Sequence, residues 1–342
     1  MKRFFCVFTV LFVSVFIVAA VSLETGRRNE AMGGVFTAQT ESEYSTFANP
    51  ASLFFYDRSH RFVIETGIGE GRPFGSKPPF PAKPEFFFRG QFIGKGMALA
   101  LGMDYQTGNC DYRPSPMLYN FVRNIELNVL FSLGYKNFSF GAGIFTLTGW
   151  INDDVEIRPD HTFIDLLTNG FFSKFQRDSS QLQVSLRAGM QYRFGRLSAG
   201  FLFRDILTYN SETTKLSFAR ALENISGGIF YQGDTYTKRG RLNKVIPAFG
   251  VEVQGAASVD KMTINSGAEV KLQFAKQRSF AMRLGYYGRV KDYANGNLTL
   301  GLGAMIGVAD ISFTANLPIP VIKRTAADGT VTVYRLSAAF LI

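Results

Sequence analysis

Side chains suited to metal binding or nucleophilic catalysis are scarce in this chain. Its 342 residues include two histidines, His60 and His161, and two cysteines, Cys6 and Cys110. Neither histidine has a cysteine or a carboxylate cluster beside it at ligand spacing, so we expect no transition-metal site. No G-x-S-x-G or Walker-type sequence is present, and a Ser–His pair would have to use one of these two histidines. The sequence therefore predicts neither an enzyme nor a bound cofactor.

Arginines within alternating segments offer the more informative chemistry. Arg187, Arg204 and Arg283 each stand in a stretch where Leu, Val or Phe take the neighbouring positions. If the apolar face lies in lipid, the charged face must point inward, because a charge on the lipid face costs up to ~2–4 kcal/mol at the midplane. The same reasoning turns further charges inward: Arg193, Lys271, Arg289, Glu252 and Glu269. Inward arginines could hold an anionic head group such as a carboxylate, or form ion pairs that stabilise a water-filled interior; both readings stay open.

The longest alternating segment runs from Gln181 to Phe194. One face is apolar and carries Leu182, Val184, Leu186, Ala188, Met190, Tyr192 and Phe194. The other face carries Gln183, Ser185, Arg187, Gly189, Gln191 and Arg193. A period of two indicates a β-strand. Strands in soluble proteins average ~5–6 residues, whereas a strand that crosses a bilayer needs ~9–11, so this segment favours a barrel with lipid outside and water inside.

Segments of this kind recur along the chain, joined by connections that alternate between short and long. About 13 strands are obvious: residues 61–67, 86–93, 97–104, 126–134, 138–148, 181–194, 196–207, 245–255, 263–274, 279–287, 297–306, 308–316 and 331–342. Single-chain bacterial barrels have even numbers of strands, so one more is expected, at residues 227–236. The prediction is an all-β, transmembrane antiparallel β-barrel of about 14 strands, with polar excursions at residues 106–124 and 149–180 and a short surface helix near residues 162–172.

The last expected strand alternates up to the final residue. Tyr334, Leu336, Ala338, Phe340 and Ile342 share one face. In a barrel this strand must pair with the first and so remove the open edge. We therefore expect outer-membrane lipids and the barrel-assembly machinery among the partners, and the outer membrane of a diderm bacterium as the location.

Residues 1–22 are expected to be a signal peptide. Lys2 and Arg3 precede an uncharged apolar run that ends in small residues. The alternative is an uncleaved membrane anchor, because the run approaches the length of a membrane span. Beyond it no stretch of ~18 apolar residues occurs, which excludes a helical membrane protein. Cleavage would leave Cys110 without a partner for an intramolecular disulfide.

Charge and aromatic content fit the same prediction. The formal net charge of +10 falls to +8 once Lys2 and Arg3 are removed. Because the basic residues are scattered over strands and turns, no nucleic-acid partner is expected. A cationic channel lining or attraction to anionic lipids uses this charge better. Aromatic residues make up 15% of the chain, enough to supply the girdles found at both membrane interfaces of barrels.

Residues 23–58 do not alternate, and two motifs stand in them. Ala31-Met32-Gly33-Gly34-Val35-Phe36-Thr37-Ala38 is followed by Ala48-Asn49-Pro50-Ala51-Ser52-Leu53. Together they resemble the start of mature FadL/TodX-type outer-membrane proteins, where G-G-A-F-T-A is followed by N-P-A-G-L. Val35 stands for the usual Ala and Ser52 for the usual Gly. Paired glycines also allow close backbone packing, and Asn-Pro forms a rigid turn.

The resemblance implies that residues 23–58 and the barrel at residues 59–342 have different roles. In that family the N-terminal segment is a hatch that blocks the lumen, so Gly33, Gly34, Asn49 and Pro50 become candidate hatch residues, unless they merely pack the segment. It further implies passive uptake of hydrophobic or amphipathic compounds such as long-chain fatty acids. Substrate would pass from outside to a site above the hatch and leave by a hatch rearrangement or a gap in the wall. Arg187, Arg204 and Arg283 are then the candidate lumenal substrate-binding residues.

Two other functions remain open at this stage. A barrel of related architecture could act in secretion or assembly, or as a surface adhesin through its excursions at residues 106–124 and 149–180. A general porin for polar solutes is the third possibility. A segment that fills the lumen argues against free diffusion, whereas a lumen lined only by polar groups would favour it.

Overall fold

The fold was analysed in a computed structural model of the chain. It describes residues 27–32, 34–39, 45–56, 60–73, 83–94, 96–111, 117–157, 180–210, 215–218, 224–233, 235–236, 244–255, 262–275, 278–322 and 331–341. The expected signal peptide at residues 1–22 and the expected surface helix near residues 162–172 lie outside these ranges. Among the helices of the described residues, none is long and apolar enough to cross a membrane.

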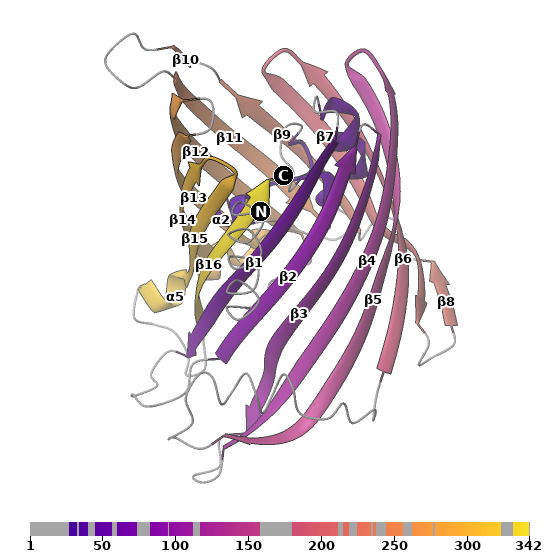
Figure 1. The fold of residues 1–342 in the computed structure, drawn as a ribbon, viewed down its shortest axis with the longest axis vertical. Coiled ribbons are helices and arrows are strands. Elements are labelled where there is room, and N and C mark those ends of the chain that lie inside the picture. The colour runs from indigo at the N-terminus through magenta and orange to yellow at the C-terminus, as the bar shows by residue number, and fades with distance from the viewer. Residues whose placement is uncertain are drawn as a thin grey trace, which may run out of the picture.

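Alternating sequence becomes antiparallel strand throughout the wall of a closed 14-strand barrel (Figure 1). The first seven wall strands are β1 (His60–Pro73), β2 (Lys83–Gly94), β3 (Met97–Asp111), β4 (Met117–Tyr135), β5 (Phe138–Ile157), β6 (Ser180–Phe194) and β7 (Leu197–Asn210). The others are β9 (Ile225–Gln232), β11 (Lys244–Gln254), β12 (Thr263–Ala275), β13 (Arg278–Arg289), β14 (Asn297–Ile306), β15 (Ala309–Pro318) and β16 (Val331–Leu341).

Two pairings close the ring. β1 lies between β2 and β16, with Val63 opposite Leu341, so the first and last strands of the wall meet as expected. β9 pairs with β7 on one side and with β11 on the other, which makes it the fourteenth wall strand. The strand that parity required within residues 227–236 is therefore confirmed, with bounds two to four residues earlier. Two short strands, β8 (Lys215–Phe218) and β10 (Thr235–Tyr236), extend β7 and β11 as hairpins and were not predicted.

The two ends of the barrel differ in their connections. Only two residues separate β2 from β3, β4 from β5, β6 from β7, β12 from β13 and β14 from β15, and these connections lie at one end, which we call the short-turn end. The opposite, long-loop end carries the connections that follow β1, β3, β5, β7, β11, β13 and β15, two of which contain η2 (Val290–Asn295) and α5 (Ile319–Ile322). The predicted excursions at residues 106–124 and 149–180 are wrong in extent, because β3 continues to Asp111, β4 begins at Met117 and β5 continues to Ile157.

The wall is apolar outside and polar inside. Leu99, Leu127, Phe140, Leu284 and Leu302 are between 42% and 53% exposed although they sit within strands. Their neighbours on the other face are buried and polar, among them Glu65, Arg89, Asn128, Gln191, Glu252 and Glu269. An outward apolar face and an inward polar face are the arrangement of a membrane barrel. Larger aromatic exposure, as at Tyr135 and Phe194, marks the short-turn rim.

Residues 27–32, 34–39 and 45–56 lie against the inner face of this wall; we call them the N-terminal segment. They contain three short helices, α2 (Arg27–Ala31), α3 (Ser45–Ala48) and η1 (Pro50–Phe55). Met32, Phe36, Phe47 and Leu53 of the segment are almost fully buried. Figure 1 shows α2 enclosed behind the strands of the front wall.

An arginine placed on the outward face should test the membrane assignment. Leu302, in the middle of β14, is 48% exposed, and Ile306, at the short-turn end of the same strand, is 63% exposed. We expect Leu302→Arg to lower the free energy of unfolding by ~2–4 kcal/mol in lipid vesicles, and Ile306→Arg by only ~0–1 kcal/mol, because the cost of a charge depends on depth. Urea titration in vesicles measures both. Equal costs at the two positions would contradict the assigned membrane depth.

Candidate functional site

Inward glycines let the N-terminal segment touch the barrel wall. A Cβ added at Gly200 would lie 2.2 Å from the Thr37 carbonyl oxygen, and one at Gly267 would lie 2.2 Å from that of Met32. At Gly141 it would lie 2.4 Å from the Ala51 nitrogen. Real Cβ atoms do not approach other atoms so closely, so any other residue would push the segment inward. Close backbone approach is a role that only glycine fills at these positions.

These glycines form a row across neighbouring strands. Gly141 is opposite Gly189, Gly200 opposite Gly228, and Gly250 opposite Gly267. Gly189 meets Asn49 of the segment, Gly250 meets Val35, and Gly301 meets Ala31. The row therefore follows the line along which the segment lies, from β5 to β14.

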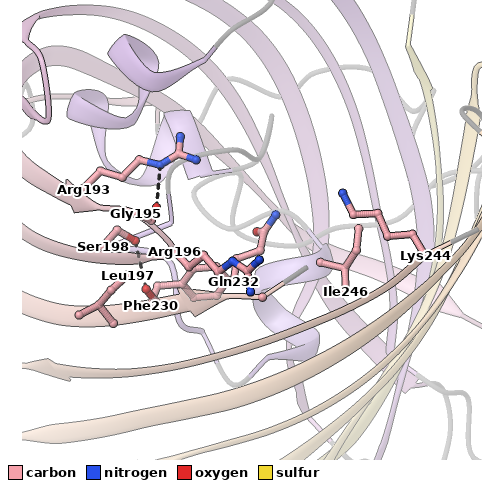
Figure 2. A pocket seen from close by; sticks show the side chains of 10 residues that line it. Arg193, Gly195, Arg196, Leu197, Ser198, Phe230, Gln232, Lys244 and Ile246 are labelled. Atoms are coloured by element: carbon pink, nitrogen blue, oxygen red, sulfur yellow. Dashed lines mark hydrogen bonds between the residues drawn. The ribbon is translucent and has the colours of Figure 1, made fainter. Parts of the chain in front are cut away.

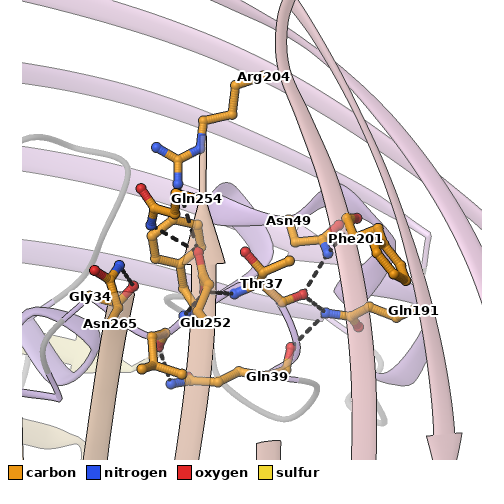
Figure 3. A network of polar contacts seen from close by, with 12 residues as sticks. Gly34, Thr37, Gln39, Asn49, Gln191, Phe201, Arg204, Glu252, Gln254 and Asn265 are labelled. Atoms are coloured by element: carbon orange, nitrogen blue, oxygen red, sulfur yellow. Dashed lines mark hydrogen bonds and ion pairs between the residues drawn. The ribbon is translucent and has the colours of Figure 1, made fainter. Parts of the chain in front are cut away.

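Glu252 of β11 holds the centre of the segment (Figure 3). Its Oε2 accepts hydrogen bonds from the backbone N–H groups of Phe36 at 2.9 Å and Thr37 at 2.8 Å. Its other oxygen accepts a 2.9 Å bond from Gln254 and lies 4.0 Å from Arg204, whose guanidinium stacks over the Phe36 ring. Hydrogen bonds to a charged acceptor are stronger than neutral ones. Glu252 thus joins the segment to β7 and β11.

Carbonyl groups of the segment are held from other strands. Gln191 of β6 donates from one Nε2 to Thr37 at 2.8 Å and Gln39 at 3.0 Å, and the Ser198 hydroxyl donates to Ala38 at 2.6 Å. Thr299 of β14 donates to the Ala31 carbonyl at 3.1 Å. Buried backbone groups need partners, and here the wall supplies them.

Ion pairs hold the start of the segment. Arg28 donates to both oxygens of Glu269, at 3.1 and 2.7 Å, and Glu269 also accepts a 2.6 Å bond from Arg283. Arg335 of β16 pairs with Glu30. Glu269 and Arg283 are buried, so their charges are balanced chiefly by these contacts.

Three of the four predicted hatch residues are described by the structure, and each has a different structural role. Asn49 caps η1 by accepting from the Ala51 N–H at 3.1 Å, and its amide donates to the Thr37 carbonyl at 2.6 Å. Pro50 begins η1 and packs on Gly141. Gly34 has a φ of +80°, which favours glycine, and its carbonyl accepts from Asn265 at 3.2 Å. Gly33 lies outside the described residues. Their role as a hatch stays a prediction.

A first cavity, of about 180 Å³, lies on the long-loop side of the segment. Its lining comes from β4 to β7 and consists of Glu126, Asn128, Phe145, Thr146, Gln183, Ser185, Arg187 and Asp205. The Arg187 guanidinium stacks over the Phe145 ring at 3.9 Å and lies 3.6 Å from the Asp205 carboxylate. We call it the Arg187 cavity. It combines one buried cation, two carboxylates, one aromatic face and several amide and hydroxyl groups.

A bulge in β7 creates this arrangement. Leu186 is opposite Leu207 but Ala188 is opposite Phe203, so three β7 residues stand against Arg187 alone. Asp205 takes a left-handed φ of +48°, an uncommon conformation for a residue other than glycine. Bulges re-aim side chains and often accompany functional sites. Here the bulge turns Asp205 toward Arg187 while its neighbour Arg204 reaches Glu252.

A second cavity, of about 260 Å³, lies at the short-turn end (Figure 2). Its lining comes from β6, β7, β9 and β11 and consists of Arg193, Gly195, Arg196, Leu197, Ser198, Phe230, Gln232, Gly233, Lys244 and Ile246. We call it the Arg196 cavity. Ser198 lines this cavity and also donates a hydrogen bond to the Ala38 carbonyl, so the segment borders the cavity.

The three arginines predicted to bind substrate do not converge. Arg187 lines a cavity, Arg204 lies between Glu252 and Phe36, and Arg283 is bonded to Glu269. The ion pairs of the last two, with Glu252 and Glu269, join wall strands and match the alternative of ion pairing in the interior. Phe145 and Asp205 were not singled out from the sequence. The row of inward glycines marks the path of the segment, but the glycines form a row only once the strand register is known.

Within the described residues, no group of three or more His, Cys, Asp or Glu side chains is placed to hold a metal ion.

Replacing Gly200 should loosen the segment. We expect Gly200→Ala to speed hydrogen exchange at the Phe36 and Thr37 amides by at least about tenfold, since the added Cβ would displace the Thr37 carbonyl. Gly90→Ala is the control, because its Cβ would meet only Phe62, at 3.8 Å. Unchanged exchange in Gly200→Ala, with the barrel folded, would contradict the close contact.

Removing the Glu252 carboxylate should have a similar local effect. Glu252→Ala leaves the Phe36 and Thr37 N–H groups without their acceptor. Charged hydrogen bonds contribute ~1.5–3 kcal/mol, so we expect local opening to become roughly 10- to 100-fold more frequent. Single-channel conductance in planar bilayers should rise in parallel. Glu126→Ala, at the Arg187 cavity, serves as control; an equal rise there would argue against a specific role for Glu252.

Comparison with known proteins finds similarity in solved structures but not in sequence. No protein-family model and no curated protein sequence matches the chain. Among solved structures, the CymD monoaromatic hydrocarbon channel superposes with a TM-score of 0.56 at 13% identity, covering 94% of this chain and 98% of that one. The Ralstonia pickettii toluene transporter TbuX gives 0.51 at 12% identity, with 94% and 98% covered.

The Pseudomonas putida toluene transporter TodX gives a TM-score of 0.52 at 11% identity, with 95% of this chain and 99% of that chain covered. At these identities the likeness concerns the fold. The resemblance to FadL/TodX-type proteins, stated from two short motifs, is thus confirmed as a shared fold over nearly the whole length: this chain has the barrel fold of the FadL-type hydrocarbon channels.

Proposed function

We propose that this protein is an outer-membrane channel for the passive uptake of hydrophobic or amphipathic compounds such as long-chain fatty acids. Its long-loop end faces outward and its short-turn end faces the periplasm, as in bacterial barrels generally. The apolar outer face contacts outer-membrane lipids. Residues 1–22 direct export, and barrel-assembly machinery inserts the strands. The N-terminal segment acts as the hatch.

One observation carries the proposal: the inward face of β6 is divided into three zones. Gln183, Ser185 and Arg187 line the Arg187 cavity. Gly189 and Gln191 contact the N-terminal segment. Arg193 lines the Arg196 cavity. A compound that travels along this face meets a cavity, then the segment, then a second cavity, which is the order a gated channel needs.

The Arg187 cavity suits a small aromatic ring or a polar head group. Its volume of about 180 Å³ is below the ~300–1,000 Å³ typical of sites for drug-sized ligands. A fatty acid would place its carboxylate beside Arg187 and extend its tail toward the long-loop end. A monoaromatic hydrocarbon, the class that the CymD and TodX channels are named for, would stack near Phe145. Arg187 is the one cation of the described lining, and an acid would pair with it in place of Asp205.

Movement of the segment is favoured by its incomplete hydrogen bonding. Gln39 Oε1 and Gln191 Oε1 are buried without a hydrogen-bond partner among the described protein groups. Each unmade bond costs ~1–3 kcal/mol, so water that enters the interface stabilises a displaced segment. The part of the segment around Thr37 and Gln39, which is held by polar bonds, can exchange them for bonds to water, as a hatch must.

The function is tested by uptake into proteoliposomes. We expect the purified protein to admit both toluene and oleate. Arg187→Gln should raise the dissociation constant for oleate about tenfold or more and leave toluene entry unchanged, because charged hydrogen bonds contribute ~1.5–3 kcal/mol. Arg289→Gln, an exposed arginine at the end of β13, is the matched control.

Two results would count against the proposal. No uptake of either compound by a barrel that migrates as folded on a heat-modifiable gel would remove the transport function and favour an assembly or adhesive role. Rapid uptake of small sugars by the same vesicles would favour a general porin.

A further inference from the structure

An unpaired hydrogen-bond acceptor lies in the lining of the Arg187 cavity. Asn128 of β4 lines this cavity and is only 4% exposed. Its Oδ1 is buried and has no hydrogen-bond partner among the described protein groups. A buried polar atom that has lost water and gained no new partner costs free energy, so most such atoms in native proteins are paired. This exception marks a place where a bound molecule can supply the missing partner.

The neighbouring carboxylate fixes the direction in which the Asn128 amide points. The Asn128 Nδ2 donates to Glu126 Oε2 at 3.3 Å. An ionised carboxylate can only accept, so the amide turns its N–H side to Glu126 and its oxygen away. Turning the amide over would bring two acceptors together. The free group of Asn128 is therefore an acceptor, and the partner that it lacks must be a donor.

Apolar side chains flank the same acceptor. Phe145 of β5 is directly opposite Asn128, and Ala100 of β3 is opposite it on the other side. Both belong to the buried apolar cluster that also contains Leu130. Side chains opposite each other on neighbouring strands lie within contact distance, so Asn128 presents its acceptor at the edge of an apolar cluster. A concave site with apolar surface and a few polar groups is the usual form of a ligand site.

The volume of the cavity limits its ligand to about one ring. An apolar protein cavity of ~150 Å³ holds a benzene molecule. At about 180 Å³ the Arg187 cavity has room for one six-membered ring with a small substituent. Volume and unpaired acceptor together describe a ligand that consists of a single ring with a hydrogen-bond donor.

We propose that the Arg187 cavity is a phenol-binding site, in which Asn128 Oδ1 accepts a hydrogen bond from the hydroxyl group and the ring lies beside Phe145. As a filter for what enters the channel, this site rests on the proposed function; as a binding site it does not. A phenol keeps its proton near neutral pH, because its pKa is close to the ~10 of tyrosine. A carboxylate and a methyl group carry no such donor. Asn128 is then the residue that distinguishes hydroxylated rings from hydrocarbons.

Fluorinated probes test the site in the full-length protein in detergent micelles. The probes are 4-fluorophenol, 4-fluoroanisole and 4-fluorotoluene, which share one ring, and only the phenol carries a donor. Their dissociation constants are measured by fluorine NMR titration, with empty micelles of the same detergent as the blank. We expect the wild-type protein to bind 4-fluorophenol at least about fivefold more tightly than either other probe, because only the phenol pairs with the buried oxygen.

Two variants separate recognition by Asn128 from the general effect of removing a buried amide. Asn128→Leu should raise the dissociation constant for 4-fluorophenol about five- to tenfold and leave those of the other two probes unchanged, because only the phenol loses a hydrogen bond. Gln91→Met is the matched control. Gln91 of β2 is fully buried and both its amide atoms lack a hydrogen-bond partner, yet it is not among the described residues that line the cavity. This variant should bind all three probes as the wild type does.

The proposal is overturned if wild-type protein does not bind 4-fluorophenol, if it binds the three probes equally, or if a folded Asn128→Leu barrel keeps the preference for the phenol. An equal loss in Gln91→Met would also overturn it, because the effect would then come from repacking. The wild-type comparison decides even if Asn128→Leu fails to fold. Failure of the proposed function is a separate result: it appears as absent uptake of toluene and oleate in proteoliposomes by a protein that still prefers the phenol.

Discussion

Contact between the N-terminal segment and a glycine row on the wall is the constraint on which the interior depends. Segment N–H and C=O groups are buried and need partners, and wall side chains can supply them only if the backbones lie close together. Gly200, Gly250 and Gly267 provide that closeness. Glu252 can then accept from two consecutive N–H groups, Phe36 and Thr37, at ordinary hydrogen-bond lengths. With side chains at the glycine positions, the segment would move inward and these bonds would be lost.

Two parts of the segment are consequently held in different ways. Phe47, Leu53 and Tyr56 share a large apolar cluster with the wall residues Val63, Ile93, Ala98, Ala100, Leu130, Phe145 and Ala339. The earlier part shares a smaller cluster, Met32, Val35 and Ala38 with Phe230 and Ala248, and is also held by hydrogen bonds and ion pairs to polar wall groups, as at Gln191, Ser198 and Glu269. Breaking apolar contacts exposes surface to water at a free-energy cost that grows with area, whereas polar groups can regain hydrogen bonds from water. Displacing the part of the segment around Val35 and Ala38 would therefore cost less apolar burial than displacing the part around Phe47 and Leu53.

Sequence reasoning was strongest where one physical rule acts alone. Side-chain alternation located the wall strands, and parity located β9, whose glycine-rich sequence gives little strand signal by itself. It was weaker where tertiary contacts decide. Alternation correctly predicts that Arg283 points inward. Only the fold shows that its guanidinium is hydrogen-bonded to Glu269. Asp205 faces Arg187 because a bulge breaks the alternation of β7. The residue pattern of β7 does not predict that bulge. Polar excursions were overextended because β3, β4 and β5 continue beyond their apolar stretches.

Charge balance along the lumen also bears on how firmly an anion would be held there. Near Arg187, Asp205 competes for the guanidinium at 3.6 Å, and Asp205 is 34% exposed, so an entering carboxylate would exchange one ion pair for another and be held weakly. Glu126 lines the same cavity, so the one cation of its described lining stands among two carboxylates. A passive channel needs sites that are favourable enough to enter and weak enough to leave, and a cation that already has a carboxylate partner meets the second requirement.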